Sequence, residues 1–248
     1  MYKREARRVE QALRAKGVVA IMLKAHARSP EDVVTTVRCI HDAGLFPEVT
    51  YRIDSGIVRE AMQEINRIRA SDDSGDPLLV GIGSVTDPHE LEDAIGMGFD
   101  MVVSPDNAFE GFGRKIEFAR IARDASVFSA PGAMTPGEFR YWLAGEDGIV
   151  PDAIKVFPAS VYGPEGLGRM LDPYERDRYA GRIVVPTGGV NAANARAYRE
   201  HIERRGFDVV LAMSDPLSSA LRDGRPGDEA AIRKSLDDFK LKMAAASW

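Results

Sequence analysis

A single lysine interrupts an apolar stretch near the middle of the chain, Ala153–Pro158. Side chains of a strand alternate between its two faces, so Lys155 and Phe157 share one face. A lone lysine in such a place more often reaches water at a sheet edge, because unpaired lysines are rarely buried. In a strand enclosed by a barrel the amine would instead be desolvated, which lowers its pKa and leaves free amine near neutral pH. A free amine is the nucleophile that forms a Schiff base with a ketone, so Lys155 is a candidate catalytic residue.

Three polar residues alternate in a second strand-like stretch, at Glu48, Thr50 and Arg52. One interpretation is an ion pair that faces solvent and contributes little. The other is that a barrel strand directs all three side chains inward, where Arg52 would hold a substrate carboxylate with its planar fork. Arg52 would then also lower the pKa of Lys155, and Glu48 would be a buried carboxyl of raised pKa that carries protons. The spacing leaves both interpretations open.

A third candidate consists of backbone groups in the run Pro186–Gly189 (PTGG). Gly188 and Gly189 can present N–H groups with no side chain in the way. The loops after strands seven and eight are the usual phosphate-binding loops of α/β barrels. A tight turn into the next helix is the alternative, because a Gly-Gly pair by itself is weak evidence.

The pattern around these residues predicts strands and helices in alternation. Apolar runs bounded by turn residues predict eight strands, each followed by a helix: Gly17–Leu23, Phe46–Arg52, Leu78–Val85, Asp100–Pro105, Ser126–Ala133, Ala153–Ala159, Arg182–Val190 and Asp208–Ser214. Eight such units in 248 residues predict a single domain over 1–248, an α/β protein with the (βα)₈ TIM-barrel fold. An amphipathic leading helix is predicted over 1–16. A doubly wound sheet is the rival, but it would need fewer strands and a break where the winding reverses.

Capping residues predict where several helices begin. Three of them stand directly before a proline in the first helical turn, namely Ser29, Asp87 and Thr135. Asn191 is predicted to cap the helix that follows strand seven. A further helix is predicted from about Phe109 to Arg123.

In a barrel of this kind the active site lies at the carboxyl ends of the strands. That rule gathers the candidate substrate-binding and catalytic residues at one mouth: Glu48, Thr50, Arg52, Ser84, Pro105, Lys155, Phe157, Thr187, Gly188, Gly189 and Ser214.

Composition argues against several other classes of protein. The net charge of −5 disfavours a nucleic-acid binder, and no stretch is long and apolar enough to span a membrane. The one cysteine, Cys39, cannot form an internal disulfide, so a reducing, cytoplasmic location is expected. The four histidines lack metal-ligand spacing, and no glycine fingerprint for a dinucleotide follows a strand.

The motifs at the strand ends resemble those of the KDPG/KHG aldolases, class I enzymes that cleave 2-keto-3-deoxy-6-phosphogluconate or 4-hydroxy-2-oxoglutarate. The matching segments run in order through most of the chain: PEVTYR (Pro47–Arg52), GIGSV (Gly81–Val85), VSP (Val103–Pro105), APG (Ala130–Gly132), KVFPA (Lys155–Ala159) and PTGG (Pro186–Gly189). Any one segment is weak evidence, whereas the ordered set is specific.

The resemblance implies roles for the residues that would handle pyruvate. Lys155 corresponds to the Schiff-base lysine, Glu48 to the general acid and base, and Arg52 to the clamp on the pyruvate carboxylate. Ser84 stands where the family usually has threonine, and its hydroxyl would bind the keto acid.

The residues that would handle the aldehyde depart more from the family pattern. Pro105 corresponds to the proline beside the aldehyde, and Gly188 and Gly189 to the phosphate loop. At the end of strand eight, however, two family glycines are replaced, and Asp215 follows directly. A carboxylate there would repel a phosphate, so the aldehyde half is expected to have diverged.

The function that the resemblance implies is a class I aldolase. It would release pyruvate and an aldehyde from a 2-keto-3-deoxy sugar acid, phosphorylated or not, or pyruvate and glyoxylate from 4-hydroxy-2-oxoglutarate. The implied enzyme uses no metal or other cofactor, takes a small-molecule keto acid, binds neither nucleic acid nor membrane, and forms a homotrimer. Two alternatives stay open: a non-covalent barrel isomerase or synthase acting on a phosphorylated small molecule, and a keto-acid-binding barrel without activity.

Overall fold

The computed structural model describes residues 4–71, 76–106, 111, 113–174 and 176–246. The chain alternates between helix and strand throughout these residues, and it begins with helix α1 (Ala6–Lys16). None of the helices in this part of the chain combines the length and the apolar character that crossing a membrane would require.

The strands form two sheets in which every strand pair among the described residues is parallel. The larger sheet has the order β10-β1-β2-β3-β4-β5, and the smaller has the order β6-β7-β8-β9. The strands are β1 (Val18–Met22), β2 (Phe46–Thr50), β3 (Gly81–Gly83), β4 (Met101–Val103), β5 (Phe128–Ala130), β6 (Gly132–Ala133), β7 (Ala153–Val156), β8 (Ile183–Pro186), β9 (Asp208–Val209) and β10 (Leu211–Met213).

The two sheets meet at both of their edges. On one side only Pro131 separates β5 from β6. On the other side the Val210 N–H donates to the Val184 carbonyl at 3.2 Å, and Thr187 pairs with Ala212 in a parallel bridge. Neighbouring strands therefore continue across both junctions between the sheets.

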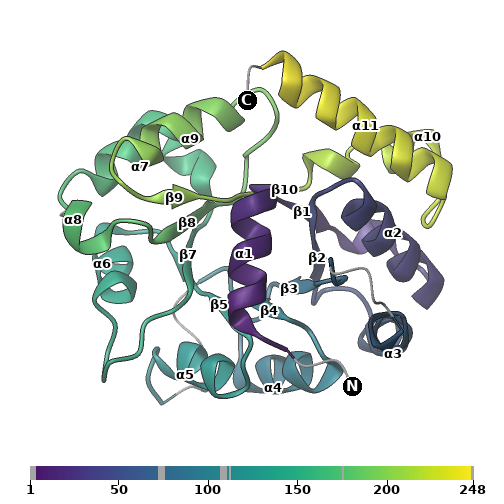
Figure 1. The fold of residues 1–248 in the computed structure, drawn as a ribbon, viewed down its shortest axis with the longest axis horizontal. Coiled ribbons are helices and arrows are strands. Elements are labelled where there is room, and N and C mark those ends of the chain that lie inside the picture. Colours follow the sequence, from purple (N-terminus) through teal and green to yellow (C-terminus); the bar gives the residue numbers. More distant parts are fainter. Residues whose placement is uncertain (1–3, 72–75, 107–110, 112, 175, 247–248) are drawn as a thin grey trace.

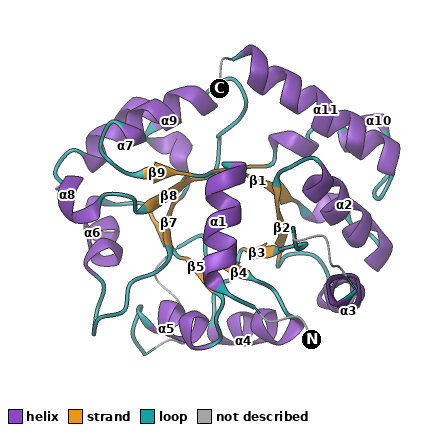
Figure 2. Ribbon diagram, viewed as in Figure 1, coloured by secondary structure: helices purple, strands orange, loops and turns teal. Residues whose placement is uncertain are grey.

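Helices lie on the outside of the strands (Figure 2). They are α2 (Pro30–Asp42), α3 (Ser55–Ala70), α4 (Pro88–Met97), α5 (Glu117–Asp124), α6 (Pro136–Ala144), α7 (Gly163–Leu171), α8 (Arg176–Tyr179), α9 (Ala195–Glu203), α10 (Ala220–Asp223) and α11 (Glu229–Ala245). Because each connecting helix returns the chain to the same end of the sheet, successive strands run parallel and their carboxyl ends face the same way.

The predicted helix starts at Ser29, Asp87 and Thr135 are confirmed. Each of these side chains accepts a hydrogen bond from the N–H three residues on, and each is followed by a proline in the first turn. At two of these starts the acidic residue in that third position accepts the N–H of the capping residue in return, which completes a capping box. The pairs are Asp32 with Ser29 and Glu138 with Thr135. A cap satisfies N–H groups that the helix itself cannot pair, so these short sequences fix where α2, α4 and α6 begin.

Buried apolar residues form two layers. The larger cluster packs between the strands and the outer helices. The smaller cluster, called the inner cluster here, lies on the opposite face of the strands and includes Phe46, Met101, Phe128 and Ile183. Because strand residues alternate between faces, strands such as β1, β2, β7 and β8 contribute to both layers.

Helix α1 covers the amino-terminal end of the strands. It crosses the middle of the view in Figure 1, in front of the strands. Its Val9 and Leu13 are buried and belong to the inner cluster. Gly17, in a left-handed conformation with φ 67°, ends the helix directly before β1 begins. Apolar side chains of α1 thus cover one end of the inner cluster.

Some predicted boundaries were wrong, for local physical reasons. The stretch Ser126–Ala133 forms two consecutive strands, β5 and β6, because Pro131 between them has no N–H to donate to a neighbouring strand. The eighth predicted strand divides at Val210, between β9 and β10. The helix predicted from Phe109 begins at Glu117 in the structure, and residues 107–110 and 112 lie outside the described residues.

Asn191 lies four residues before α9, which begins at Ala195. Its side chain accepts the N–H groups of Ala193 at 2.9 Å and of Asn194 at 3.3 Å. It therefore caps the turn that leads into α9, and the helix begins later than the sequence predicts.

Candidate active site

Glu48 and Lys155 both lie on the strand face that carries the inner cluster. Phe46 and Ala153 belong to the inner apolar cluster, and Glu48 and Lys155 stand two residues after them on the same strand faces. Only 4% of Glu48 and 5% of Lys155 is exposed to solvent. The strands β2 and β7 thus bring a carboxyl and an amine into the same dry interior.

Burial shifts the pKa values of both groups toward their neutral forms. It raises the pKa of Glu48, and the charge of Lys155 acts in the opposite direction. It lowers the pKa of Lys155, and the charge of Glu48 opposes this shift. Each group is therefore close enough to the other to affect its ionisation. Because its pKa is lowered, Lys155 is uncharged at a lower pH than an ordinary lysine.

The carboxyl group of Glu48 occupies space that only a glycine at position 83 leaves open. A Cβ atom at Gly83 would collide with Glu48 Oε1 and lie 3.0 Å from its Cδ. Gly83 ends β3, the strand that pairs with β2. The glycine therefore determines where the carboxyl can lie.

Phe157 connects the lysine to the loop after β8. Lys155 Nζ lies 5.0 Å from the centre of the Phe157 ring. The same ring packs against Gly188, where an added Cβ would come within 3.1 Å of it. Gly188 and Gly189 both have positive φ values, 82° and 80°, so this loop has a backbone shape that glycine adopts without strain.

The mouth above Glu48 is lined with polar groups from the ends of β2 and β3. Thr50 is buried, and its Oγ1 lies 3.1 Å from Ser84 Oγ. Ser84 has a φ of 65°, which is uncommon for a residue with a side chain and costs on the order of 1–3 kcal/mol. Strained backbone conformations of this kind are concentrated at functional sites, where they hold a side chain or a backbone group in a particular orientation.

Arg52 lies at the rim of this mouth. Strand β2 ends at Thr50, so the alternation of the strand does not extend to residue 52. The Arg52 guanidinium donates to the Ser84 carbonyl at 2.7 Å and forms an ion pair with Glu90 of α4. Half of the side chain, 50%, is exposed. The expectation that Arg52 lowers the pKa of Lys155 is wrong: that shift comes from burial, against the charge of Glu48.

Pro105 and the β6 strand approach each other closely. A Cβ atom on Gly132 would collide with the Pro105 carbonyl oxygen. Gly132 is in turn the β6 partner of Lys155 in the parallel ladder. Pro105 therefore lies one strand away from the lysine.

The remaining predicted residues lie at the ends of β8 and β10. Thr187 is buried and donates from its Oγ1 to the Val185 carbonyl at 3.2 Å. It pairs with Ala212, two residues before Ser214, so these two strand ends are adjacent. Ser214 is half-buried and precedes the short 3-10 turn Asp215–Leu217.

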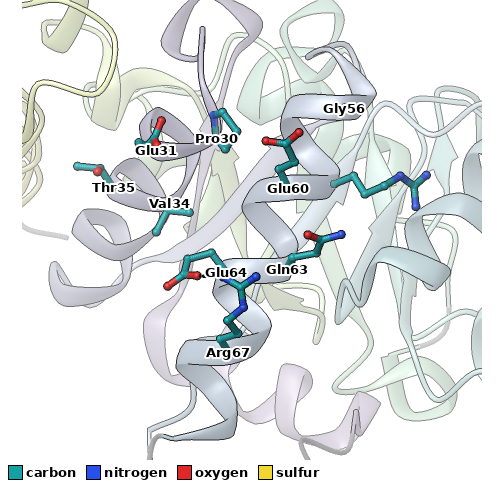
Figure 3. A pocket seen from close by; sticks show the side chains of 10 residues that line it. Pro30, Glu31, Val34, Thr35, Gly56, Glu60, Gln63, Glu64 and Arg67 are labelled. Atoms are coloured by element: carbon teal, nitrogen blue, oxygen red, sulfur yellow. Dashed lines mark hydrogen bonds and ion pairs between the residues drawn. The ribbon is translucent and has the colours of Figure 1, made fainter.

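A groove lies elsewhere, on the outer surface. A groove of about 890 Å³ runs between α2 and α3, and its lining includes Glu31, Val34, Glu60 and Gln63 (Figure 3). Its side chains mix both charges, and it contains none of the predicted site residues. The interior position of Lys155, and not the size of a surface groove, therefore identifies the candidate active site.

Sequence reasoning missed two residues that shape this site. Gly83 stands out in the sequence only as part of the segment GIGSV (Gly81–Val85), although a glycine on the inward face of a strand signals a close approach by another group. Glu90, the partner of Arg52, lies in the first turn of α4, and nothing in its local pattern indicates that partner.

The chain matches the model of one protein family, described as KDPG and KHG aldolase, over residues 9–204. A curated relative, the 2-dehydro-3-deoxy-6-phosphogalactonate aldolase of Escherichia coli strain K12, is 27% identical over 166 residues, which cover 67% of this chain and 71% of that protein.

Two solved structures show the same fold. The native KDPGal structure has a TM-score of 0.67 and 21% identity, and the match covers 93% of this chain and 95% of that one. The KDPG aldolase of Legionella pneumophila, with pyruvate captured as a covalent carbinolamine intermediate, has a TM-score of 0.63 and 19% identity over 94% of this chain and 95% of that one. At these identities the likeness is one of fold.

Proposed function

We propose, from the premise that this chain belongs to the KDPG and KHG aldolase family and is therefore a lyase, that it is a class I enzyme acting through Lys155. Its substrate would be a 2-keto-3-deoxy sugar acid, cleaved to pyruvate and an aldehyde, or 4-hydroxy-2-oxoglutarate, cleaved to pyruvate and glyoxylate. The observation that carries this proposal is an almost fully buried amine of lowered pKa next to a buried carboxyl.

The first half of the reaction makes and uses an electron sink. The uncharged Nζ of Lys155 attacks the C2 ketone, the resulting carbinolamine loses water, and an iminium forms. A base then takes the proton of the C4 hydroxyl. The electron pair of the C3–C4 bond moves into the iminium, which gives an enamine of pyruvate and a free aldehyde. Glu48 is our candidate for this base, directly or through a water.

The second half returns the enzyme to its starting state. The protonated Glu48 gives its proton to C3 of the enamine, which restores the iminium and the Glu48 carboxylate. Water adds at C2, and collapse of the carbinolamine releases pyruvate and the free amine of Lys155. Burial serves both halves. It favours the neutral amine of Lys155, and it raises the pKa of Glu48 so that this carboxyl can hold and give a proton closer to neutral pH.

The proposed binding residues divide between the two products. Arg52, Thr50 and Ser84 would hold the pyruvate half, since they border the opening above Glu48. The guanidinium of Arg52 bonds Ser84 and Glu90 through Nη2, and its Nε and Nη1 have no hydrogen-bond partner among the described residues, which supports a role in binding a carboxylate.

The aldehyde half would lie along the other strand ends. Phe157 would pack against the substrate next to the lysine. The neighbouring binding groups in this proposal are Pro105, Thr187, Gly188, Gly189 and Ser214.

Reductive trapping tests the proposed function. Borohydride added together with pyruvate should leave a permanent adduct on Lys155, located by mass spectrometry of peptides, because hydride reduces the iminium to a stable amine. An unmodified Lys155 in folded protein would overturn the Schiff-base mechanism and favour a non-covalent enzyme or a keto-acid-binding protein.

The architecture of this proposal is a single-domain (βα)₈ barrel over 1–248 with α1 as a leading helix. The contacts at both junctions between the sheets support closure of the ring. We further propose a cytoplasmic homotrimer, on the basis of the family resemblance. Sedimentation analysis of the full chain measures the assembly, and a monomer would contradict the trimer without affecting the chemistry.

A further inference from the structure

A carboxylate lies between the loops that follow β8 and β10. Asp215 Oδ2 accepts the N–H of Ala192 at 2.9 Å, and this bond ties the end of β10 to the loop after Gly189. The Thr187–Ala212 bridge holds the same two strand ends together from below. In α/β barrels this is the place where backbone N–H groups receive a phosphate, and here an acidic side chain already uses one of them.

The loop after β8 is firmly held around that carboxylate. The Gly188 carbonyl accepts the N–H of Ser160 at 2.9 Å, and the Gly189 carbonyl accepts the side-chain N–H of Asn194, also at 2.9 Å. A Cβ atom on Gly189 would lie 2.5 Å from that of Ser160. Among the described residues the N–H groups of Gly188 and Gly189 have no acceptor. The loop therefore keeps two donors for a substrate while Asp215 supplies a negative charge and an acceptor.

The loops that follow β7, β8 and β10 contain no cation to balance that charge. In these loops, segments 157–163, 187–194 and 214–219, Asp215 is the one residue charged at neutral pH. The loop after β1 carries Lys24, His26 and Arg28, but His26 is buried against the Leu217 carbonyl, and none of the three forms an ion pair with Asp215 within the described part of the chain. A phosphate would meet an unbalanced carboxylate here, and the two anions would repel each other.

We infer that Asp215 determines specificity for a 2-keto-3-deoxy sugar acid that lacks a terminal phosphate. The relative from Escherichia coli is named for a 6-phosphorylated sugar acid, so this chain would differ from it in the end of the substrate that it accepts. The inference rests on the proposed function. A distal hydroxyl of the substrate would donate to the Asp215 carboxylate, and the N–H groups of Gly188 and Gly189 would donate to neighbouring oxygens. None of these groups takes part in the carbon–carbon cleavage.

The test compares 2-keto-3-deoxygluconate with its 6-phosphate, two substrates that differ only in the phosphate. Wild-type enzyme should show the higher kcat/KM with the unphosphorylated acid. Asp215→Asn keeps the shape and the acceptor for the Ala192 N–H but removes the charge. It should shift the ratio of kcat/KM values toward the phosphorylated acid by about tenfold or more. Inorganic phosphate should also inhibit this variant at lower concentrations than it inhibits the wild type.

A matched control is Asp237→Asn on α11, which makes the same change of net charge at an exposed site away from the mouth. It should leave the ratio as it is in the wild type. A wild-type preference for the phosphorylated acid, or an unchanged ratio in Asp215→Asn, would overturn the inference. Trapping of pyruvate on Lys155 reports the proposed function separately, because it uses no aldehyde. An adduct without the expected preference would refute the role of Asp215 alone, and no adduct would refute the aldolase mechanism.

Discussion

The two ends of the strand interior have the same geometry but opposite chemistry. At the amino-terminal end, Val9 and Leu13 of α1 pack against Phe46 and other apolar residues of the inner cluster. Two residues further along the same strand faces, the interior holds Glu48 and Lys155. The two layers are about 7 Å apart along a strand. Both are buried, but among the described residues of these two layers only the second contains ionisable groups.

This contrast shows how the protein separates stability from activity. Removal of apolar surface from water stabilises the closed end by about 25 cal/mol for each Å² buried. Burial of a carboxyl and an amine costs free energy and shifts the pKa values of both groups, and those shifts make covalent chemistry possible. The apolar end therefore offsets what the polar end costs.

The largest effect is expected when the lysine at the polar end becomes apolar. Lys155→Met should lower kcat by about 10³-fold or more, because no other group can form the iminium. The side chain keeps its length, and the fold should persist because a buried amine has been replaced by an apolar group. Lys240→Met, at an exposed position of α11, is the control and should retain full activity. Turnover and thermal unfolding are measured on both, and substantial activity in Lys155→Met would contradict the assignment.

At the apolar end the expected effect is on stability. Leu13 is almost fully buried, with 1% exposed, so Leu13→Ala should lower the free energy of unfolding by about 2–5 kcal/mol. Because Leu13 lies in the layer away from the mouth, kcat at a temperature where the variant is folded should stay near that of the wild type. Leu241→Ala, with 69% of the side chain exposed in the wild type, should change stability by less than about 0.5 kcal/mol. Denaturant unfolding measures both changes. A large loss of kcat in folded Leu13→Ala would show that the two ends are coupled.

A smaller effect on activity is expected from Gly83, the glycine whose missing side chain leaves room for the Glu48 carboxyl. A Cβ atom in Gly83→Ala would displace the Glu48 carboxyl and should lower kcat by about 10²-fold. Gly96→Ala in α4 adds a Cβ that meets nothing within 4 Å, and it should leave kcat unchanged and stabilise the helix by up to about 1 kcal/mol. Steady-state kinetics on this pair of Gly→Ala variants separate displacement of Glu48 from a general effect of an added methyl group. Equal kcat values in the two variants would argue against a fixed carboxyl position.

The smallest expected effect is a shift in pH dependence. The pKa of Lys155 is lowered from its ordinary value of 10.5, so the rate of trapping with pyruvate and cyanoborohydride should reach its plateau below that pH. The charge of Glu48 raises the pKa of Lys155, and Glu48→Gln removes that charge. The midpoint of the rising limb should therefore move to lower pH in this variant, whatever the loss in absolute rate. Glu60→Gln, exposed on α3, should leave the midpoint in place. A midpoint that moves upward in Glu48→Gln would contradict the coupling.

Features that depend on neighbouring residues could be predicted from the sequence. The alternation of strands and helices, the helix starts at Ser29, Asp87 and Thr135, and the placing of Lys155 in an apolar strand all follow from short-range patterns. Hydrophobic periodicity and capping act within a few residues, so they can be recognised before the fold is known.

Other features depend on which strand lies beside which, and the sequence does not contain that information locally. Strand alternation placed Arg52 inside, but β2 ends two residues earlier and Glu90 of α4 holds the guanidinium at the rim. The space that Gly83 leaves for Glu48, across the pairing of β2 with β3, likewise depends on strand register.

The sequence by itself determined the order of the elements and the types of groups available for chemistry, because both follow from local periodicity and residue identity. The tertiary structure decided the pKa values of Glu48 and Lys155 and the bond that holds Asp215 to Ala192. Burial and proximity between residues more than 20 positions apart arise only when the strands assemble side by side.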